Sequence, residues 1–415
     1  MALVGTRSIS QRRPRTGQPR RRQLVVRSVM LSGFPWKWVL IGVLCAGHCT
    51  IQAQTAVSRQ SPEVKQAMQL DQQGRYANAA QAWRGIAERN PRDAIAWASL
   101  GLDLARQGKY PDAVSAYQKA MTLNPRIPGL QLNLGLALFK QGKLDEAIPP
   151  LKRALATAPV GEQASVLLGM SYYGTARYAQ AVPYLRAAVA KSPQNVEMRG
   201  VLAQSCLYAK QYNCVLDEYK KILLANPDSA QAHMLAGEAL DGLNQTDKAI
   251  AEFQAAARAA PTEPNVHFGL GYLLWKQHRY PEAAEEFRKE IQNEPMHAQA
   301  LAYLGDTEMK LEHTAEAEAI LRRAVHQVGA TPLAWLDLGI VLAAQGKNED
   351  AASDFRQAIQ LNPETVDAHW RLARLYQATG KTEQARAEFA KARALHEKED
   401  KALVQQMTPP VPSPH

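Results

Sequence analysis

The sequence predicts an all-α fold, a solenoid of ten antiparallel helical hairpins in tandem. Prolines recur every 34 residues through most of the chain, at Pro91, Pro125, Pro159, Pro193, Pro227, Pro261 and Pro295. Alanine stands at position 20 of nine of the ten windows of this length, and glycine or alanine stands at position 8 of all ten. Self-similarity at a fixed period of this size indicates a repeat architecture in which each unit packs on the next.

A basic leader precedes the repeats. Residues 1–37 contain nine of the 49 basic residues and no acidic ones, and an apolar run over residues 38–47 follows. This run is too short to span a bilayer, which needs about 20 residues. The pattern predicts a secretory signal peptide within residues 1–55, cleaved near Ala53 or Ala56, with Met30 as an alternative start. We therefore expect an exported protein, periplasmic or envelope-associated; the alternative is an uncleaved segment that anchors the chain to the inner membrane.

A frame that starts at Gln60 gives ten gapless repeats and ends at Glu399. The repeats are residues 60–93, 94–127, 128–161, 162–195, 196–229, 230–263, 264–297, 298–331, 332–365 and 366–399. Residues 400–415 follow, and their prolines predict a disordered tail. The array leaves no segment for a second folded domain.

Each repeat has the pattern of a helical hairpin. In the second repeat, Trp97, Leu100 and Leu104 share one helical face, and Ala113 and Tyr117 share another. A helix-ending residue, often glycine, separates the two segments. The proline near the end of the repeat cannot continue the second helix. Small residues at positions 8 and 20 allow the two helices to cross closely, and a large apolar residue at position 24 fills the space beside them.

These residues resemble a known family. The matching residues of the second repeat are Trp97, Leu100, Gly101, Tyr110, Ala113, Tyr117, Ala120 and Pro125. They match the tetratricopeptide repeat pattern, and the resemblance covers residues 60–399. It implies a right-handed superhelical α-solenoid that binds other proteins. Departures are local, and they include Val215 in repeat 5, Glu290 in repeat 7 and Gly329 in repeat 8.

Charge and motifs exclude several functions. Outside the leader, 40 basic residues face 39 acidic ones, so the repeats lack the basic surface that a nucleic-acid binder needs. No phosphate-binding loop, zinc motif or nucleophile elbow occurs. His233, His267 and His369 occupy position 4, where the family favours tryptophan, and we interpret them as aromatic packing residues rather than metal ligands. We expect no enzymatic activity, no cofactor and no metal.

The repeats contain two cysteines, Cys206 and Cys214, on the two helices of repeat 5. An oxidising compartment would allow a disulfide between them. The alternative is a pair of buried thiols.

The resemblance implies that the first helices line a concave surface and that positions 2, 5, 9 and 12 meet the ligand. The apolar residues at or beside these positions are Leu132, Leu136, Phe139, Val166, Met170, Tyr173, Phe268, Tyr272, Trp275 and Tyr303. Glu238, Asp241 and Asp306 add negative charge between and beside them. A partner segment with apolar and basic side chains would fit this groove. The alternative is that neighbouring first helices half-bury these residues.

The sequence thus predicts a protein–protein interaction scaffold or adaptor, working in the bacterial cell envelope. One alternative is a structural subunit of a secretion, pilus or polysaccharide-export assembly. Another is a substrate-recruiting partner of a separately encoded enzyme.

Overall fold

The computed structural model describes residues 61–156 and 161–407, which form 20 α-helices and no strand. The first helices of the ten hairpins are α2 (Pro62–Gln72), α4 (Ala94–Arg106), α6 (Leu130–Lys140), α8 (Gly161–Gly174), α10 (Val196–Tyr208), α12 (Ala230–Gly242), α14 (Val266–Lys276), α16 (Ala298–Lys310), α18 (Pro332–Ala344) and α20 (Val366–Ala378). The second helices are α3 (Tyr76–Arg89), α5 (Tyr110–Leu123), α7 (Leu144–Ala154), α9 (Tyr178–Lys191), α11 (Tyr212–Ala225), α13 (Thr246–Ala259), α15 (Tyr280–Asn293), α17 (Thr314–Val325), α19 (Asn348–Leu361) and α21 (Thr382–Met407).

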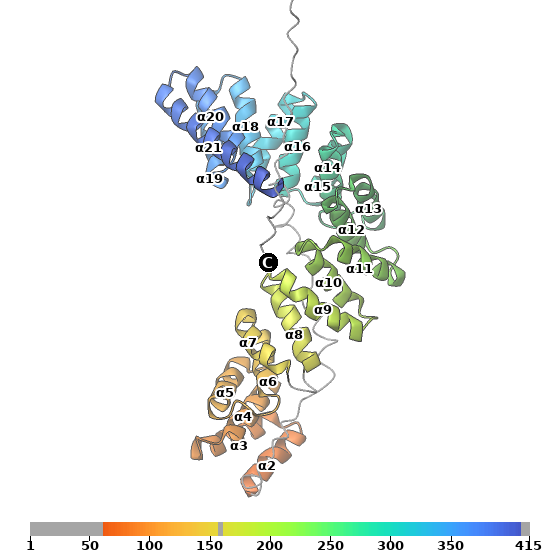
Figure 1. The fold of residues 1–415 in the computed structure, drawn as a ribbon, viewed down its shortest axis with the longest axis vertical. Coiled ribbons are helices and arrows are strands. Elements are labelled where there is room, and N and C mark those ends of the chain that lie inside the picture. The colour runs from red at the N-terminus through yellow and green to blue at the C-terminus, as the bar shows by residue number, and fades with distance from the viewer. Residues whose placement is uncertain (1–60, 157–160, 408–415) are drawn as a thin grey trace, which may run out of the picture. The chain divides into compact units, whose positions relative to one another are not determined.

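Each helix packs on the helix that precedes it and on the helix that follows it (Figure 1). Several first helices also contact the first helix of the next hairpin, as α14 contacts α16 and α16 contacts α18. The all-α solenoid of ten consecutive hairpins is therefore confirmed. Within the described ranges, no helix has the length and apolar character required to cross a bilayer. The predicted signal peptide lies outside these ranges.

Close packing inside each hairpin follows the predicted pattern. The backbone of Gly101 lies so near the ring of Tyr117 that an added Cβ would stand 2.6 Å from the ring carbons. Gly271 meets Phe287 in the same way in repeat 7. The tight crossing thus comes from a missing side chain at position 8 opposite a large one at position 24.

The turn between the two helices has the same backbone geometry in all ten repeats. The residue at position 15 has a positive φ in each one, although only five repeats carry glycine there. In the others the position is held by Ala176, Lys210, Asn244, His278 and Glu312. The packing of the hairpin therefore imposes the left-handed conformation even on residues such as Lys210 and Glu312, which do not favour it.

Helix α21 continues to Met407, eight residues beyond the end of the repeat frame. The segment expected to be a tail from residue 400 onward therefore begins as helix. The first residue that cannot continue a helix is Pro409, which explains why the helix extends this far.

Glu290 departs from the repeat pattern, and the structure explains why. It replaces the alanine that most repeats have at position 27, and its side chain is fully buried. Its Oε1 accepts the Asn265 N–H at 2.8 Å and its Oε2 accepts the Phe268 N–H at 3.0 Å. Asn265 itself provides no side-chain cap for α14. Glu290 therefore caps the first helix of its own repeat from the second helix.

We predict that Glu290→Ala, although it restores the common residue of the family, lowers the free energy of unfolding by about 1–3 kcal/mol. The variant leaves two buried N–H groups without an acceptor. Denaturant unfolding followed by circular dichroism measures the effect. Glu285→Ala, an exposed change on the same helix, is the control and should shift stability by no more than about 0.5 kcal/mol. Equal stability of the two variants would contradict the capping role.

Candidate functional site

The apolar residues predicted on the first helices of repeats 3 and 4 lie on α6 and α8, which contact each other. Three of them are buried, namely Leu132, Phe139 and Met170. The others are half-buried, namely Leu136, Val166 and Tyr173. The Tyr173 hydroxyl donates a hydrogen bond to the Gln204 side chain on α10. This part of the predicted surface therefore combines packing residues with side chains that solvent still reaches.

The four aromatic residues predicted in repeats 7 and 8 form one cluster. The Trp275 and Tyr303 ring centroids are 5.2 Å apart, and those of Tyr272 and Tyr303 are 5.5 Å apart, both edge to face. Phe268 adjoins Tyr303 with a centroid distance of 5.9 Å. All four side chains are buried. The structure thus brings the predicted residues together, and their burial favours the packing alternative; their role in partner binding stays a prediction.

The acidic residues of α12 differ in their environment. Asp241 forms an ion pair with Lys276, which comes from α14. Glu238 has a buried Oε1 with no hydrogen-bond partner among the described residues. Burial, with a smaller contribution from the negative charge of Asp241, raises the pKa of Glu238 to about 8. Asp241 is therefore paired with an internal cation, whereas burial favours the protonated form of Glu238.

Asp306 and a residue that the sequence reasoning missed, Asp337, are buried on neighbouring first helices. The Trp275 Nε1–H donates to Asp306 Oδ2 at 2.6 Å. Asp337 lies on α18, where its Oδ2 has no hydrogen-bond partner among the described residues. Asp337 is the only charged residue of that otherwise apolar helix, a signal in the sequence that could have identified it.

The histidines at position 4 make polar contacts rather than purely apolar ones. His233 Nδ1 lies 2.7 Å from Glu252 Oε2, and His267 Nδ1 lies 2.6 Å from Glu286 Oε2. His369 contacts Glu388 in the same way. In each case a histidine on the first helix contacts a glutamate on the second helix, at position 23 of the repeat. These pairs tie the two helices of a hairpin, which the interpretation as aromatic packing residues did not include.

Two groups of acidic residues and histidine have ligand atoms within 4.8 Å of one another, but their atoms already have structural partners. One group contains Glu290, whose oxygens cap α14. The other contains Glu308 and Glu316, which both accept hydrogen bonds from Arg288. The oxygens of Glu290 are already used as caps, and Arg288 competes with any metal ion for Glu308 and Glu316. We therefore propose a metal site at neither group.

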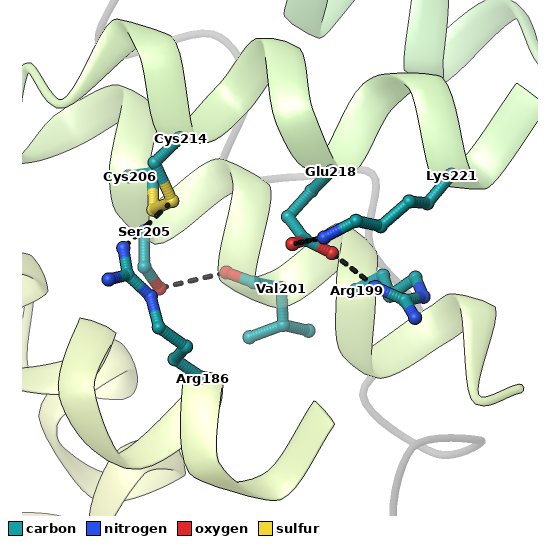
Figure 2. The surroundings of a disulfide bond; sticks show 8 residues. All are labelled: Arg186, Arg199, Val201, Ser205, Cys206, Cys214, Glu218 and Lys221. Carbon is teal, nitrogen blue, oxygen red and sulfur yellow. Dashed lines mark hydrogen bonds and ion pairs between the residues drawn. A yellow bond between two sulfur atoms is a disulfide. The ribbon is translucent and has the colours of Figure 1, made fainter. Parts of the chain in front are cut away.

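Cys206 and Cys214 are joined by a disulfide in the structure (Figure 2). Cys206 on α10 is fully buried and Cys214 on α11 is half-buried. Arg186, which comes from the preceding repeat, donates a hydrogen bond to the Cys214 sulfur at 3.5 Å. Nearby, Glu218 forms ion pairs with Arg199 at 2.5 Å and with Lys221 at 2.7 Å. The two helices of repeat 5, α10 and α11, are therefore joined by one disulfide and by the ion pair between Arg199 and Glu218.

Comparison with known families finds tetratricopeptide repeats along the chain. One tetratricopeptide repeat profile matches residues 64–126, 99–162, 216–264 and 268–334, and a second matches residues 173–239 and 342–407. A search of curated proteins found no match.

Solved structures similar to this chain include the following three. YrrB, described as a tetratricopeptide repeat protein with an unusual peptide-binding site, is 23% identical, with a TM-score of 0.37; the match covers 46% of this chain and 98% of YrrB. MamA from Desulfovibrio magneticus RS-1 is 20% identical, with a TM-score of 0.37 over 41% of this chain and 97% of MamA. An IFIT1 monomeric mutant with Gppp-AAAA is 15% identical, with a TM-score of 0.41 over 80% of this chain and 90% of its own.

We predict that replacing both cysteines, Cys206→Ala and Cys214→Ala, destabilises the fold by about 2.5 kcal/mol, the entropic value for a closed loop of this length. Under non-reducing conditions, mass spectrometry should recover the peptides of Cys206 and Cys214 as one linked species. Reductant should lower the unfolding midpoint of the wild type and leave that of the double variant unchanged. Full alkylation of both thiols in the oxidised, native protein would contradict the bond.

Proposed function

Because the chain belongs to the tetratricopeptide repeat family, we propose that it is a non-enzymatic scaffold that binds partner proteins through the first helices of its repeats. Tetratricopeptide repeats are in general interaction modules. The array of hairpins extends from α2 to α21 with no other kind of element between them in the described ranges. A stack of this kind presents an extended surface on which each repeat contributes a few side chains.

One observation carries the proposal, namely the apolar side chains that remain half-buried on α6 and α8. Leu136, Val166 and Tyr173 stand at positions 9, 5 and 12, which the family uses for ligands. The packing of each hairpin depends mainly on positions 8, 20 and 24, so these side chains exceed what the hairpin itself requires. Partly exposed apolar residues on adjacent helices, with polar residues beside them, suit a protein partner. We name the set formed by these three residues the α6–α8 face.

We also propose that the protein is exported to the cell envelope. The basic leader with its short apolar run supports this location. The Cys206–Cys214 disulfide is consistent with it, because such bonds persist in oxidising compartments and are rare in the cytosol. The scaffold would then organise envelope proteins or hold a client in its groove.

We predict that Leu136→Glu combined with Val166→Glu strongly weakens partner binding, because both changes place charge on the α6–α8 face. Affinity purification from envelope extracts, with quantitative mass spectrometry, should show that specific partners fall by about tenfold or more, as expected when interface residues that contribute most to binding are changed. Thermal unfolding should show that the variant remains folded.

Leu224→Glu is the matched control for this experiment, because Leu224 is 87% exposed on the second helix α11. It introduces the same charge at a leucine outside the α6–α8 face, and it should retain the partners of the wild type. If the α6–α8 variant recovers the same proteins at the same yield as this control, the proposed face is wrong.

We predict that a protease digests the protein in cells whose outer membrane is permeabilised and whose inner membrane is intact, because an exported solenoid lies outside the cytoplasm. N-terminal sequencing of the purified protein should find a new terminus near Ala53 or Ala56 if the leader is cleaved. Full protection from protease, with the leader retained, would contradict export.

A further inference from the structure

The disulfide of repeat 5 joins a core position to a surface position. Cys206 stands at position 11, which is leucine in six of the other nine repeats, and it is fully buried. Cys214 stands at position 19 and is half-buried. The other nine repeats all have an exposed polar or charged residue there, from Asn78 in repeat 1 to Gln384 in repeat 10. One cysteine thus belongs to the interior and the other to the boundary with solvent.

The hairpin does not depend on this bond for its shape. The nine other hairpins have the same positive-φ turn without a cysteine at either position. In repeat 5, the ion pair between Arg199 and Glu218 also joins α10 to α11, and the α11 side chains of Val215 and Ile222 are buried. The disulfide can therefore open while the two helices stay packed.

The surroundings of Cys214 favour a negative charge on its sulfur. Arg186 on α9 is exposed, and its Nη2 donates a hydrogen bond to Cys214 Sγ at 3.5 Å (Figure 2). Cys214 is also the third residue of α11, whose first turn contains no acidic residue and receives no side-chain cap. A neighbouring arginine and the N-terminus of a helix each stabilise a thiolate relative to a thiol.

The acidic residues near Cys214 oppose this effect only weakly. Helix α9 contains none, and α11 contains Asp217 and Glu218. Glu218 forms ion pairs with Arg199 and Lys221, so its charge is compensated. Asp217 is exposed, and the charge of an exposed carboxylate is screened by water and salt. The positive contributions therefore dominate at the Cys214 sulfur.

We propose that Cys214 is a site of thiol–disulfide exchange, at which an external dithiol opens the bond to Cys206 and the corresponding external disulfide closes it. This chemistry is additional to the scaffold function and independent of it. Access decides which sulfur reacts first, because a residue at the solvent boundary can be reached and a fully buried one cannot. The thiolate is the reacting form of a cysteine, and the surroundings of Cys214 favour it.

Closure of the bond proceeds in two steps. The Cys214 thiolate attacks one sulfur of the external disulfide, and the other external sulfur leaves as a thiolate and takes up a proton. Cys206 then loses its proton and attacks Cys214 Sγ, so that the Cys206–Cys214 bond forms and the first external sulfur leaves with its electron pair and is protonated. Two electrons pass from the cysteine pair to the external disulfide, which becomes a dithiol. Opening is the reverse and begins with attack of an external thiolate on Cys214 Sγ.

The first test compares two single-cysteine variants, Cys206→Ala and Cys214→Ala, with oxidised glutathione as the probe disulfide. Both also carry Cys45→Ser and Cys49→Ser, so that the leader contributes no thiol. Mass spectrometry follows the formation of the mixed disulfide with time. Cys214 should react about tenfold or more faster than Cys206, because an accessible thiolate is reactive and a buried thiol is inert. Equal rates, or a faster reaction of Cys206, would overturn the proposal.

The second test addresses Arg186 in the Cys206→Ala background. At neutral pH, the fraction of Cys214 present as thiolate, measured by ultraviolet absorbance, should fall about twofold to fivefold in Arg186→Leu, the size of an exposed charge interaction. Arg84→Leu is the matched control, because Arg84 is an exposed arginine on α3 in repeat 1, and it should leave the fraction unchanged. A fall no larger than that of the control would contradict the role of Arg186.

The third test uses the wild type, so it does not depend on the folding of any variant. Reduced glutathione is added to the oxidised native protein, the reaction is quenched with acid, and the mixed disulfide is located by mass spectrometry. Glutathione should be attached to Cys214, with Cys206 released as a thiol. Glutathione attached to Cys206, or no adduct at either cysteine, would show that Cys214 is not the site of exchange.

Discussion

The close crossing of two helices inside each hairpin is the constraint on which the rest of the structure depends. In repeat 2 this crossing brings the backbone of Gly101 against the ring of Tyr117, with no room for a Cβ between them. Because the two helices then share one apolar interior, the hairpin must turn tightly, and position 15 adopts the left-handed conformation even where lysine or glutamate occupies it. The outer side of each hairpin remains apolar and is buried against the next one.

This constraint explains why the fold could be predicted from the sequence. A close crossing leaves a small residue at position 8 of all ten repeats and alanine at position 20 of nine, and proline stands near the end of eight of the ten units. The period therefore defined the hairpins without knowledge of any contact between repeats. The turns were harder to read, because glycine marks only some of them. Lys210 and Glu312 adopt the left-handed conformation because of the packing of the hairpin. The identity of the residue at that position therefore does not predict the turn.

The candidate site could be predicted only in part, because its character depends on contacts between repeats. Positions 12 and 9 identified Trp275 and Asp306, and Tyr303 was predicted beside them at position 6; the structure brings the three together. How deeply these residues are buried depends on the distance between adjacent first helices, which the pattern does not specify. Asp337 was missed because the repeat pattern assigns no role to its position, and its interaction with Asp306 crosses from one repeat to the next. Glu290 was recorded as a departure for a similar reason, since its partners are backbone groups of another helix.

The central claim is that this protein meets its partners on the first helices of the array. Site-specific photocrosslinking in the living cell tests it most directly, with benzoylphenylalanine placed at Leu136 on α6 or at Leu224 on α11. Our account predicts adducts with other proteins from position 136 and none from position 224. Adducts from position 224 alone would place the partners on the second helices and contradict the account.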